Sequence, residues 1–117
     1  MPMNKTDAAR QKLLSGLGLC AKARALVLGT PMVCEALRGK RKPYLVLEAA
    51  DTSLATHKKI TDKCKFYQVR HVRLPIAGQE LAAALGKSSL LAVVAVCDEH
   101  LCRMVQMALE AMDEPTE

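Results

Sequence analysis

The sequence predicts an α/β protein in which helices cover both sides of a small, mostly buried sheet. Three observations favour this fold class. Amphipathic helical stretches alternate with short apolar runs, about five helices with four strands. The apolar runs are continuous, as in strands that are covered on both faces. No repeat or linker interrupts the alternation, so we expect one domain over residues 1–117, with its core at about 7–112.

The first helix is predicted to start at Asp7, whose carboxylate can accept hydrogen bonds from the first helical turn. Its apolar positions recur every three or four residues, as on one buried helix face: Leu13, Leu14, Leu17, Cys20 and Ala21. A short strand is predicted at residues 25–28. The next helix follows, with Thr30 placed to cap it and Pro31 suited to the first helical position, and it runs to about Arg38.

The middle of the chain predicts two strands with a basic helix between them. Residues 44–47 form a short continuous apolar run, which is typical of a central strand. Asp51 and Thr52 can cap a third helix. One stripe of that helix is expected to face inward: His57, Ile60, Thr61, Cys64 and Tyr67. Residues 71–74 indicate a further strand, closed by Pro75.

The last third of the chain predicts a helix, a polar loop, a strand and a final helix. The fourth helix is expected over residues 78–85, with Gly86 terminating it. Residues 90–97, rich in Val and Ala, are the strongest strand signal. Asp98 can cap a last helix that reaches about Met112. Its apolar face is broad, which indicates either a wide core stripe or a contact with a partner protein.

Charge is distributed unevenly along the chain. The first 97 residues contain sixteen Lys and Arg against six Asp and Glu, a net charge of +10, whereas the last twenty residues carry −5. This polarity favours a polyanionic partner, although solvated surface charges would have the same composition. With no Trp, one Phe and two Tyr, an aromatic base-stacking platform is not expected. The longest apolar run, residues 90–97, is far too short to cross a bilayer, so no membrane contact is expected.

The residues that carry chemistry predict neither an enzyme nor a cofactor. Five cysteines form no Cys-x-x-Cys pair and no secretion signal is visible, which favours reduced thiols in a cytoplasmic protein. No hydrolase, zinc-protease or phosphate-loop motif occurs, and His57, His71 and His100 are isolated. Cys97, His100 and Cys102 lie within six residues, so a thiol or metal site there stays an alternative.

The start of the second helix has a possible use beyond folding. Unpaired backbone N–H groups at a helix start attract phosphate, although Pro31 removes one of them. The flanking residues are basic: Lys22, Arg24, Arg38, Lys40, Arg41 and Lys42. An ordinary strand-to-helix turn beside solvated charges would have the same sequence.

Five segments follow one another in a distinctive order. They are residues 14–23, Gly29-Thr30 ahead of a helix that ends Ala36-Leu37-Arg38, YLVLEAADTS, KKITDKCKFYQV and ELAAALGKSSLLAVVAVCD; residues 60–65 and Gly86-Lys87 are the most specific pieces. Over about residues 10–110 the chain resembles the YlxQ-like bacterial branch of the L7Ae/L30e family of kink-turn-binding ribosomal proteins. The resemblance implies a three-layer α/β/α sandwich with a small mixed four-stranded sheet, and a cytoplasmic RNA-binding protein without a cofactor.

The resemblance also implies where RNA binds. In the family, a bend with tandem sheared G·A pairs is held by the start of the second helix and by the loop ahead of the last strand, residues 86–90 here. Gly29 and Thr30 match the family pattern at the helix start. Pro31, Met32 and Glu35 stand where the family has Asn, Glu and Lys. Each lost base contact typically costs about 1 to 3 kcal/mol, and Glu35 repels phosphate, so we expect looser RNA recognition.

We therefore expect a non-catalytic protein that binds structured RNA, with ribosomal RNA as one candidate. The basic residues would neutralise phosphates, Gly29 would allow close approach, Thr30 would cap the helix and donate to phosphate, and Met32 with Leu90 would contact a base. The expected RNA-binding residues are Lys22, Arg24, Gly29, Thr30, Met32, Arg38, Lys87 and Leu90. The alternative is a protein-interaction module on the same fold that docks through its last helix.

Overall fold

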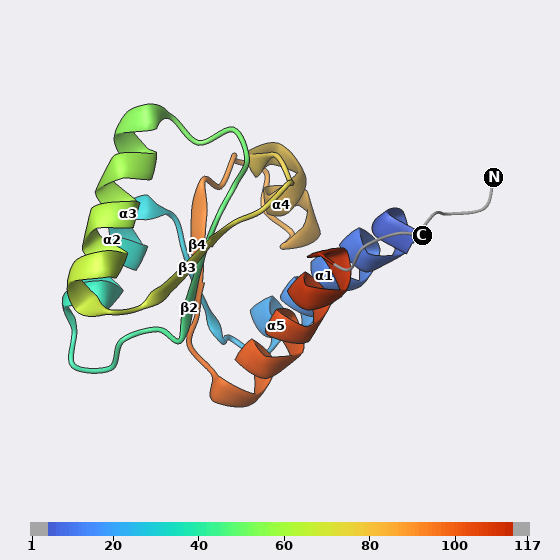
Figure 1. The fold of residues 1–117 in the computed structure, drawn as a ribbon, viewed down its shortest axis with the longest axis horizontal. Coiled ribbons are helices and arrows are strands. Elements are labelled where there is room, and N and C mark those ends of the chain that lie inside the picture. Colours follow the sequence, from blue (N-terminus) through green and yellow to red (C-terminus); the bar gives the residue numbers. More distant parts are fainter. Residues whose placement is uncertain (1–4, 114–117) are drawn as a thin grey trace.

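A computed structural model describes residues 5–113 of the chain, and it has three layers built around one sheet (Figure 1). In chain order the elements are α1 (Lys5–Lys22), β1 (Leu26–Leu28), α2 (Thr30–Arg38), β2 (Leu45–Glu48), α3 (Leu54–Tyr67), β3 (Arg70–Arg73), α4 (Gly78–Ala84), β4 (Val93–Val96) and α5 (Glu99–Asp113). The five helices and four strands predicted from the apolar periodicity are confirmed, as is the α/β/α class.

The sheet is mixed, with the strand order β1-β4-β2-β3. Strand β4 runs antiparallel to both β1 and β2, while β2 and β3 are parallel. Every residue of β2 and β4 is buried, which confirms both as central strands. The last strand is shorter than the predicted residues 90–97, because residues 90–92 belong to the loop that precedes β4 and Cys97 follows its end.

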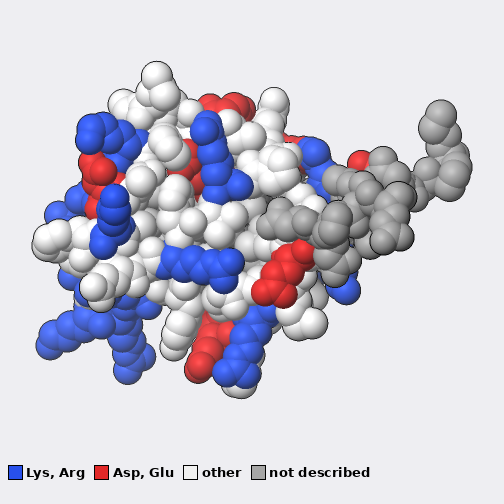
Figure 2. Space-filling model, viewed as in Figure 1, with Lys and Arg blue, Asp and Glu red and all other residues white. Residues whose placement is uncertain are grey.

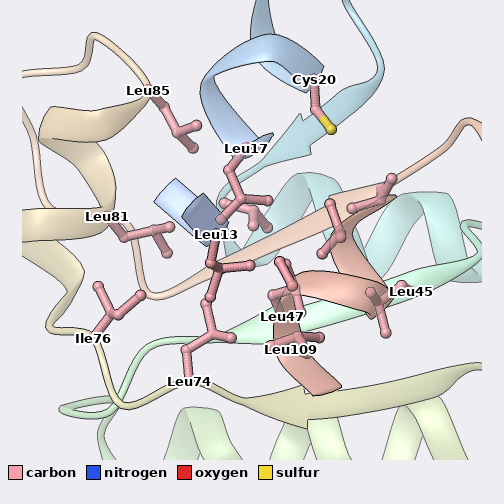
Figure 3. Packing of buried hydrophobic residues seen from close by; sticks show 14 of the residues in the cluster. Leu13, Leu17, Cys20, Leu45, Leu47, Leu74, Ile76, Leu81, Leu85 and Leu109 are labelled. Carbon is pink, nitrogen blue, oxygen red and sulfur yellow. The ribbon is translucent and has the colours of Figure 1, made fainter. Parts of the chain in front are cut away.

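Two apolar clusters fill the spaces between the layers. Strand residues alternate between the two faces of the sheet, so Leu45 and Leu47 point one way and Val46 the other. Leu45 and Leu47 pack with the leucines of α1, α4 and α5, as Figure 3 shows. Val46 packs with the buried residues of α2 and α3. Helices α1, α4 and α5 thus cover one face, and α2 and α3 cover the other (Figure 1).

The broad apolar face of α5 is explained by packing on two sides. Helix α5 contacts the sheet and lies along α1, with which it makes the most extensive contact between any two helices (Figure 1). Val105, Ala108 and Leu109 are buried there. Met107 is the one large apolar side chain of α5 that is strongly exposed among the described residues, at 70%. Core packing on two sides therefore accounts for the breadth of the stripe.

The helix starts differ from the predictions at three places. Asp7 lies within the first turn of α1 rather than ahead of it. The N-cap of α2 is Gly29, and Thr30 is the first helical residue with no capping hydrogen bond from its side chain. The cap of α3 is Ser53, whose Oγ accepts a hydrogen bond from the Thr56 N–H over 3.2 Å.

Asp51 and Thr52, the predicted caps of α3, have other partners. The Asp51 carboxylate accepts a hydrogen bond from the Gly78 N–H over 2.9 Å, so it caps the start of α4 instead. The Thr52 hydroxyl donates to the carbonyl oxygen of Ala49. By contrast, Asp98 caps α5 as predicted, because its carboxylate accepts from the Leu101 N–H over 2.9 Å.

Candidate nucleic-acid interface

The start of α2 and the loop before β4 meet at one end of the sheet. The Gly29 N–H donates to the carbonyl oxygen of Val93 over 2.9 Å, and Val93 pairs with Glu48, which pairs in turn with Arg73. We call this end, defined by Gly29, Val93, Glu48 and Arg73, the Gly29 edge. Gly29 has φ 93° and ψ 150°, a backbone conformation essentially restricted to glycine. The chain can therefore turn here from β1 directly into α2.

The first turn of α2 leaves backbone donors available. The Val33 N–H already donates to the Gly29 carbonyl, and Pro31 has no N–H. Within the described part of the chain, the N–H groups of Thr30 and Met32 have no hydrogen-bond partner. Met32 also exposes 54% of its surface. Two donors and an apolar side chain thus lie together at the Gly29 edge.

The loop of residues 86–92 is held against this edge by close packing on Gly78. The Leu91 N–H donates to the Gly78 carbonyl over 3.2 Å, and Ala92 accepts from the Ala49 N–H over 2.8 Å. A Cβ atom on Gly78 would lie 2.8 Å from the Leu91 oxygen and 3.0 Å from Leu90 Cγ, too close for any side chain. Leu90 is nevertheless 61% exposed, so it can contact a ligand.

The structure thus brings together four of the expected binding residues and places Lys22, Arg24 and Arg38 apart from them. Gly29, Thr30, Met32 and Leu90 are at the Gly29 edge, and Lys87 is exposed in the adjoining loop. Lys22 lines a groove of about 1020 Å³ between α1 and α4, together with Gly86.

Arg24 and Arg38 lie at the other end of the sheet. Arg24 precedes β1, whose first residue pairs with Val96 at the end of β4, and Arg38 closes α2. A nine-residue helix is about 13 Å long, so Arg38 is about that far from the Thr30 backbone. Arg24 and Arg38 flank the helix start in the sequence without lying beside it in space.

A buried carboxylate beneath the Gly29 edge was missed by the sequence analysis. Glu48 is fully buried at the end of β2. The Nδ1 atom of His57 lies 2.8 and 2.9 Å from its two carboxylate oxygens, and His71 Nε2 lies 2.7 Å from Oε1. The Nε of Arg73 is 3.7 Å from Oε2. The prediction that His57 and His71 are isolated is therefore wrong.

This network ties α3 and β3 to the end of β2. Buried carboxylates are costly unless their oxygens accept hydrogen bonds, and two imidazoles supply them here. Arg73 also donates to the Ala50 carbonyl over 2.7 Å, in the turn that leads to Asp51. One signal was visible in the sequence, because Glu48 ends an otherwise apolar strand. The network therefore holds the turn against which the loop of residues 86–92 packs.

The cysteines divide into four buried thiols and one exposed thiol, Cys97. Burial raises the pKa of the Cys64 thiol from 9.0 to about 11, and nearby Cys34 and Glu48 add to the shift. Burial likewise raises the pKa of Cys20, Cys97 and Cys102, which makes these thiols poor nucleophiles. Among the described residues no group of three or more His, Cys, Asp and Glu is placed to hold a metal ion, so the alternative at Cys97, His100 and Cys102 gains no support.

No helix within residues 5–113 combines the length and the apolar character that a membrane span needs.

The architecture is that of a three-layer α/β/α domain in which a glycine-capped helix start and a packed loop form one exposed edge.

Sequence comparison identifies the family to which this architecture belongs. The sequence profile of the ribosomal protein L7Ae/L30e/S12e/Gadd45 family matches residues 11–105. The RNA-binding protein YlxQ of Bacillus subtilis (strain 168) is 40% identical over 83 residues, which cover 71% of this chain and 80% of that protein. The chain belongs to the L7Ae/L30e/S12e/Gadd45 family and is a YlxQ-like member of it.

Solved structures have the same fold. A protein of unknown function from Bacillus halodurans C superposes with a TM-score of 0.75 at 33% identity, over 88% of this chain and 98% of that one. The 15.5kD RNA binding protein of Giardia lamblia superposes with a TM-score of 0.70 at 19% identity, over 97% of this chain and 93% of that one. The fold expected from the resemblance is confirmed.

Proposed function

We propose that this chain binds structured RNA at the Gly29 edge and acts as a non-catalytic RNA-binding protein. The hydrogen bond between Gly29 and Val93 carries the proposal, because it joins the two elements that the family resemblance implicates. The printed names of the Bacillus subtilis and Giardia lamblia relatives describe RNA-binding proteins, which supports the same class of ligand.

The exposed groups of the edge suit the shape of a bent RNA. The N–H groups of Thr30 and Met32 point out of a helix start, where a phosphate is stabilised by the helix dipole. Met32 and Leu90 offer apolar surface to an unstacked base. Lys87, exposed three residues before Leu90 in the same loop, would neutralise a neighbouring phosphate. The proposed ligand is a kink-turn, and ribosomal RNA is one source of such an element.

Three residues of α2 differ from the family pattern, and these differences determine which contacts with RNA the helix can make. Pro31 and Met32 cannot form the base-edge hydrogen bonds of Asn and Glu. Glu35, exposed one turn further along α2, places a negative charge near the phosphates. Recognition therefore rests on backbone geometry and apolar contact, and we expect moderate affinity with a preference for bent over straight RNA.

The experiment is a comparison of a kink-turn RNA with a plain duplex of equal length, by fluorescence anisotropy at two salt concentrations. We expect a preference for the kink-turn that persists at the higher salt concentration, because shape recognition does not depend on counterion release. Equal binding to both RNAs that depends steeply on salt would show that the chain binds RNA only through a basic surface, without recognising its shape. Binding to neither RNA would favour the alternative, a protein-interaction module.

Substitutions of exposed side chains test whether the RNA binds at the Gly29 edge. Replacing both Met32 and Leu90 by Ala removes two exposed side chains and should weaken kink-turn binding about tenfold. Met107→Ala is the control, since it removes a large, strongly exposed apolar side chain from α5. Equal effects of the two changes would place the RNA elsewhere.

A further inference from the structure

All three aromatic side chains of the chain gather at the end of the sheet opposite the Gly29 edge. Tyr44 directly precedes β2, and its N–H donates to the Val96 carbonyl over 2.9 Å. Phe66 and Tyr67 end α3, with their rings edge to face and the centroids 4.9 Å apart. We call this end, defined by Tyr44, Tyr67, Val96 and Arg70, the Tyr44 edge. The sequence alone predicts no aromatic base-stacking platform, and the fold brings its three aromatic rings to one end of the sheet.

The same edge holds a dense group of cations that lack carboxylate partners. They come from the ends of three connections between elements: Arg24, Arg38, Lys40, Arg41, Lys42 and Arg70. Within the described part of the chain none of the six forms an ion pair. Figure 2 shows blue side chains projecting at the lower left, where Figure 1 places the connection between α2 and β2. Unpaired cations at this density favour a polyanionic ligand.

A cavity of about 680 Å³ lies within this group and is lined by Arg41, Lys42, Tyr44 and Cys97. Lys42 is held in position, because its Nζ donates to the Gly39 carbonyl over 2.9 Å and lies 5.0 Å from the centroid of the Tyr67 ring. Tyr44 is 50% exposed, so its ring is accessible from the cavity. A ring and two cations around one cavity match the chemistry of a base with its flanking phosphates.

We propose that the Tyr44 edge binds a single-stranded stretch of RNA, with one base stacked on Tyr44 and neighbouring phosphates neutralised by Arg41 and Lys42. This inference rests on the proposed function, because the strand is taken to flank the bent element at the Gly29 edge. Helix α2 joins the two edges and is about 13 Å long, so one RNA can reach both. Asp98, which follows Cys97, accepts a hydrogen bond from the Leu101 N–H, so one of its carboxylate oxygens is directed to the start of α5.

The test uses three RNAs and the full chain: a kink-turn, the same kink-turn with a single-stranded tail of about ten nucleotides, and the tail alone. Tyr44→Ala should weaken binding of the tailed RNA and of the tail about tenfold, and leave the untailed kink-turn unchanged. Tyr44→Phe keeps the ring and should bind all three RNAs like the wild type. Leu90→Ala should show the reverse pattern, weakening both kink-turn RNAs but not the tail.

Cys97 provides an independent readout, because it is exposed and lines the same cavity as Tyr44. Because burial raises the pKa of Cys97, its alkylation is slow and is followed as a rate at alkaline pH. The tailed RNA should lower this rate, whereas the untailed kink-turn should not. Protection that an acidic peptide of equal charge reproduces would overturn the proposal in favour of a protein ligand.

The outcomes separate this inference from the proposed function. If the tail adds no affinity, or if Tyr44→Ala binds the tailed RNA like the wild type, the inference is wrong while kink-turn binding still supports the Gly29 edge. If the kink-turn fails to bind but the tail binds and depends on Tyr44, the proposed function is wrong and the site at the Tyr44 edge stands.

Discussion

The backbone N–H of Gly29 donates to the carbonyl oxygen of Val93 over 2.9 Å, and this bond connects the end of β1 to the beginning of β4. It places the first turn of α2 beside the loop of residues 86–92, although more than 50 residues separate them in the sequence. Met32 and Leu90, one exposed side chain from each element, are the groups through which the proposed function has the RNA bound. The account of function depends on this convergence.

Gly29→Ala should destabilise the protein by about 1 to 3 kcal/mol, because φ 93° with ψ 150° is strained for any residue with a side chain. The added Cβ meets no atom within 4 Å, so the loss of stability comes from backbone strain alone. Urea unfolding measures this loss as a change in the free energy of unfolding. Gly39→Ala is the control, since Gly39 has φ −76° and should change stability by less than about 1 kcal/mol. Equal effects would contradict the assigned strain.

Gly78→Ala should displace the loop that carries Leu90, because the new Cβ would lie 2.8 Å from the Leu91 carbonyl oxygen. We expect a loss of about 1 to 3 kcal/mol in the free energy of unfolding, together with weaker kink-turn binding. Ala83→Gly, on the exposed side of the same helix, should cost about 1 kcal/mol without affecting RNA. Undiminished RNA binding by Gly78→Ala would show that the position of the loop is unimportant.

Glu48→Gln should lower the free energy of unfolding by about 1 to 3 kcal/mol, since the buried carboxylate accepts from both His57 and His71. An amide at this position offers one acceptor oxygen and turns an NH₂ group toward the other ring. Glu35→Gln removes an equal charge from an exposed position and should change stability by less than about 0.5 kcal/mol. The two variants are compared by urea unfolding at neutral pH.

The buried thiol of Cys64 makes stability depend on alkaline pH. Its pKa is raised from 9.0 to about 11 in the folded chain, so below pH 9 the thiol is protonated in both states and contributes no pH dependence. As the pH rises from 9 toward 11, the unfolded chain loses this proton first. The free energy of unfolding therefore falls by up to about 2 to 3 kcal/mol.

Comparison with Cys64→Ala isolates this effect, because all other groups titrate alike in the two proteins. The difference in unfolding free energy between wild type and variant should shift in favour of the variant between about pH 9 and pH 11. A difference that stays constant over this range would show that Cys64 titrates normally.

Glu35→Lys should strengthen kink-turn binding several-fold, because it replaces a charge that repels phosphate by one that attracts it. The slope of log affinity against log salt concentration should steepen by about one. Glu110→Lys makes the same change of charge on the exposed side of α5 and serves as the control for net charge. If both variants gained equally, the RNA would be responding to total charge rather than to the helix start.

Periodicity predicted the elements well and the caps less well, for a physical reason. Buried strands such as β2 and β4 are continuous apolar runs, and their existence follows from local composition. Three polar residues in a row, Asp51, Thr52 and Ser53, can each cap a helix. Tertiary contacts decide which of them caps α3. The Asp51 carboxylate accepts a hydrogen bond from the Gly78 N–H, and Ser53 is the residue that caps α3.

The candidate site required information that no local pattern holds. Glu48, His57 and His71 meet because β2 and β3 pair in parallel with Val46 opposite His71, a register that spacing along the chain does not reveal. Arg24 and Arg38 border the helix start in sequence yet lie at the Tyr44 edge, because a helix carries the chain back across the sheet. Only the family resemblance predicted that Leu90 and Gly29 belong to one binding site.

The most direct test of the account is an NMR titration of the ¹⁵N-labelled chain with a kink-turn RNA that has no single-stranded tail. The account predicts that the largest amide shifts occur at Gly29, Thr30 and Met32 and in the loop of residues 86–92. Shifts confined to α5, or spread evenly over the basic residues with none at Gly29, would contradict it.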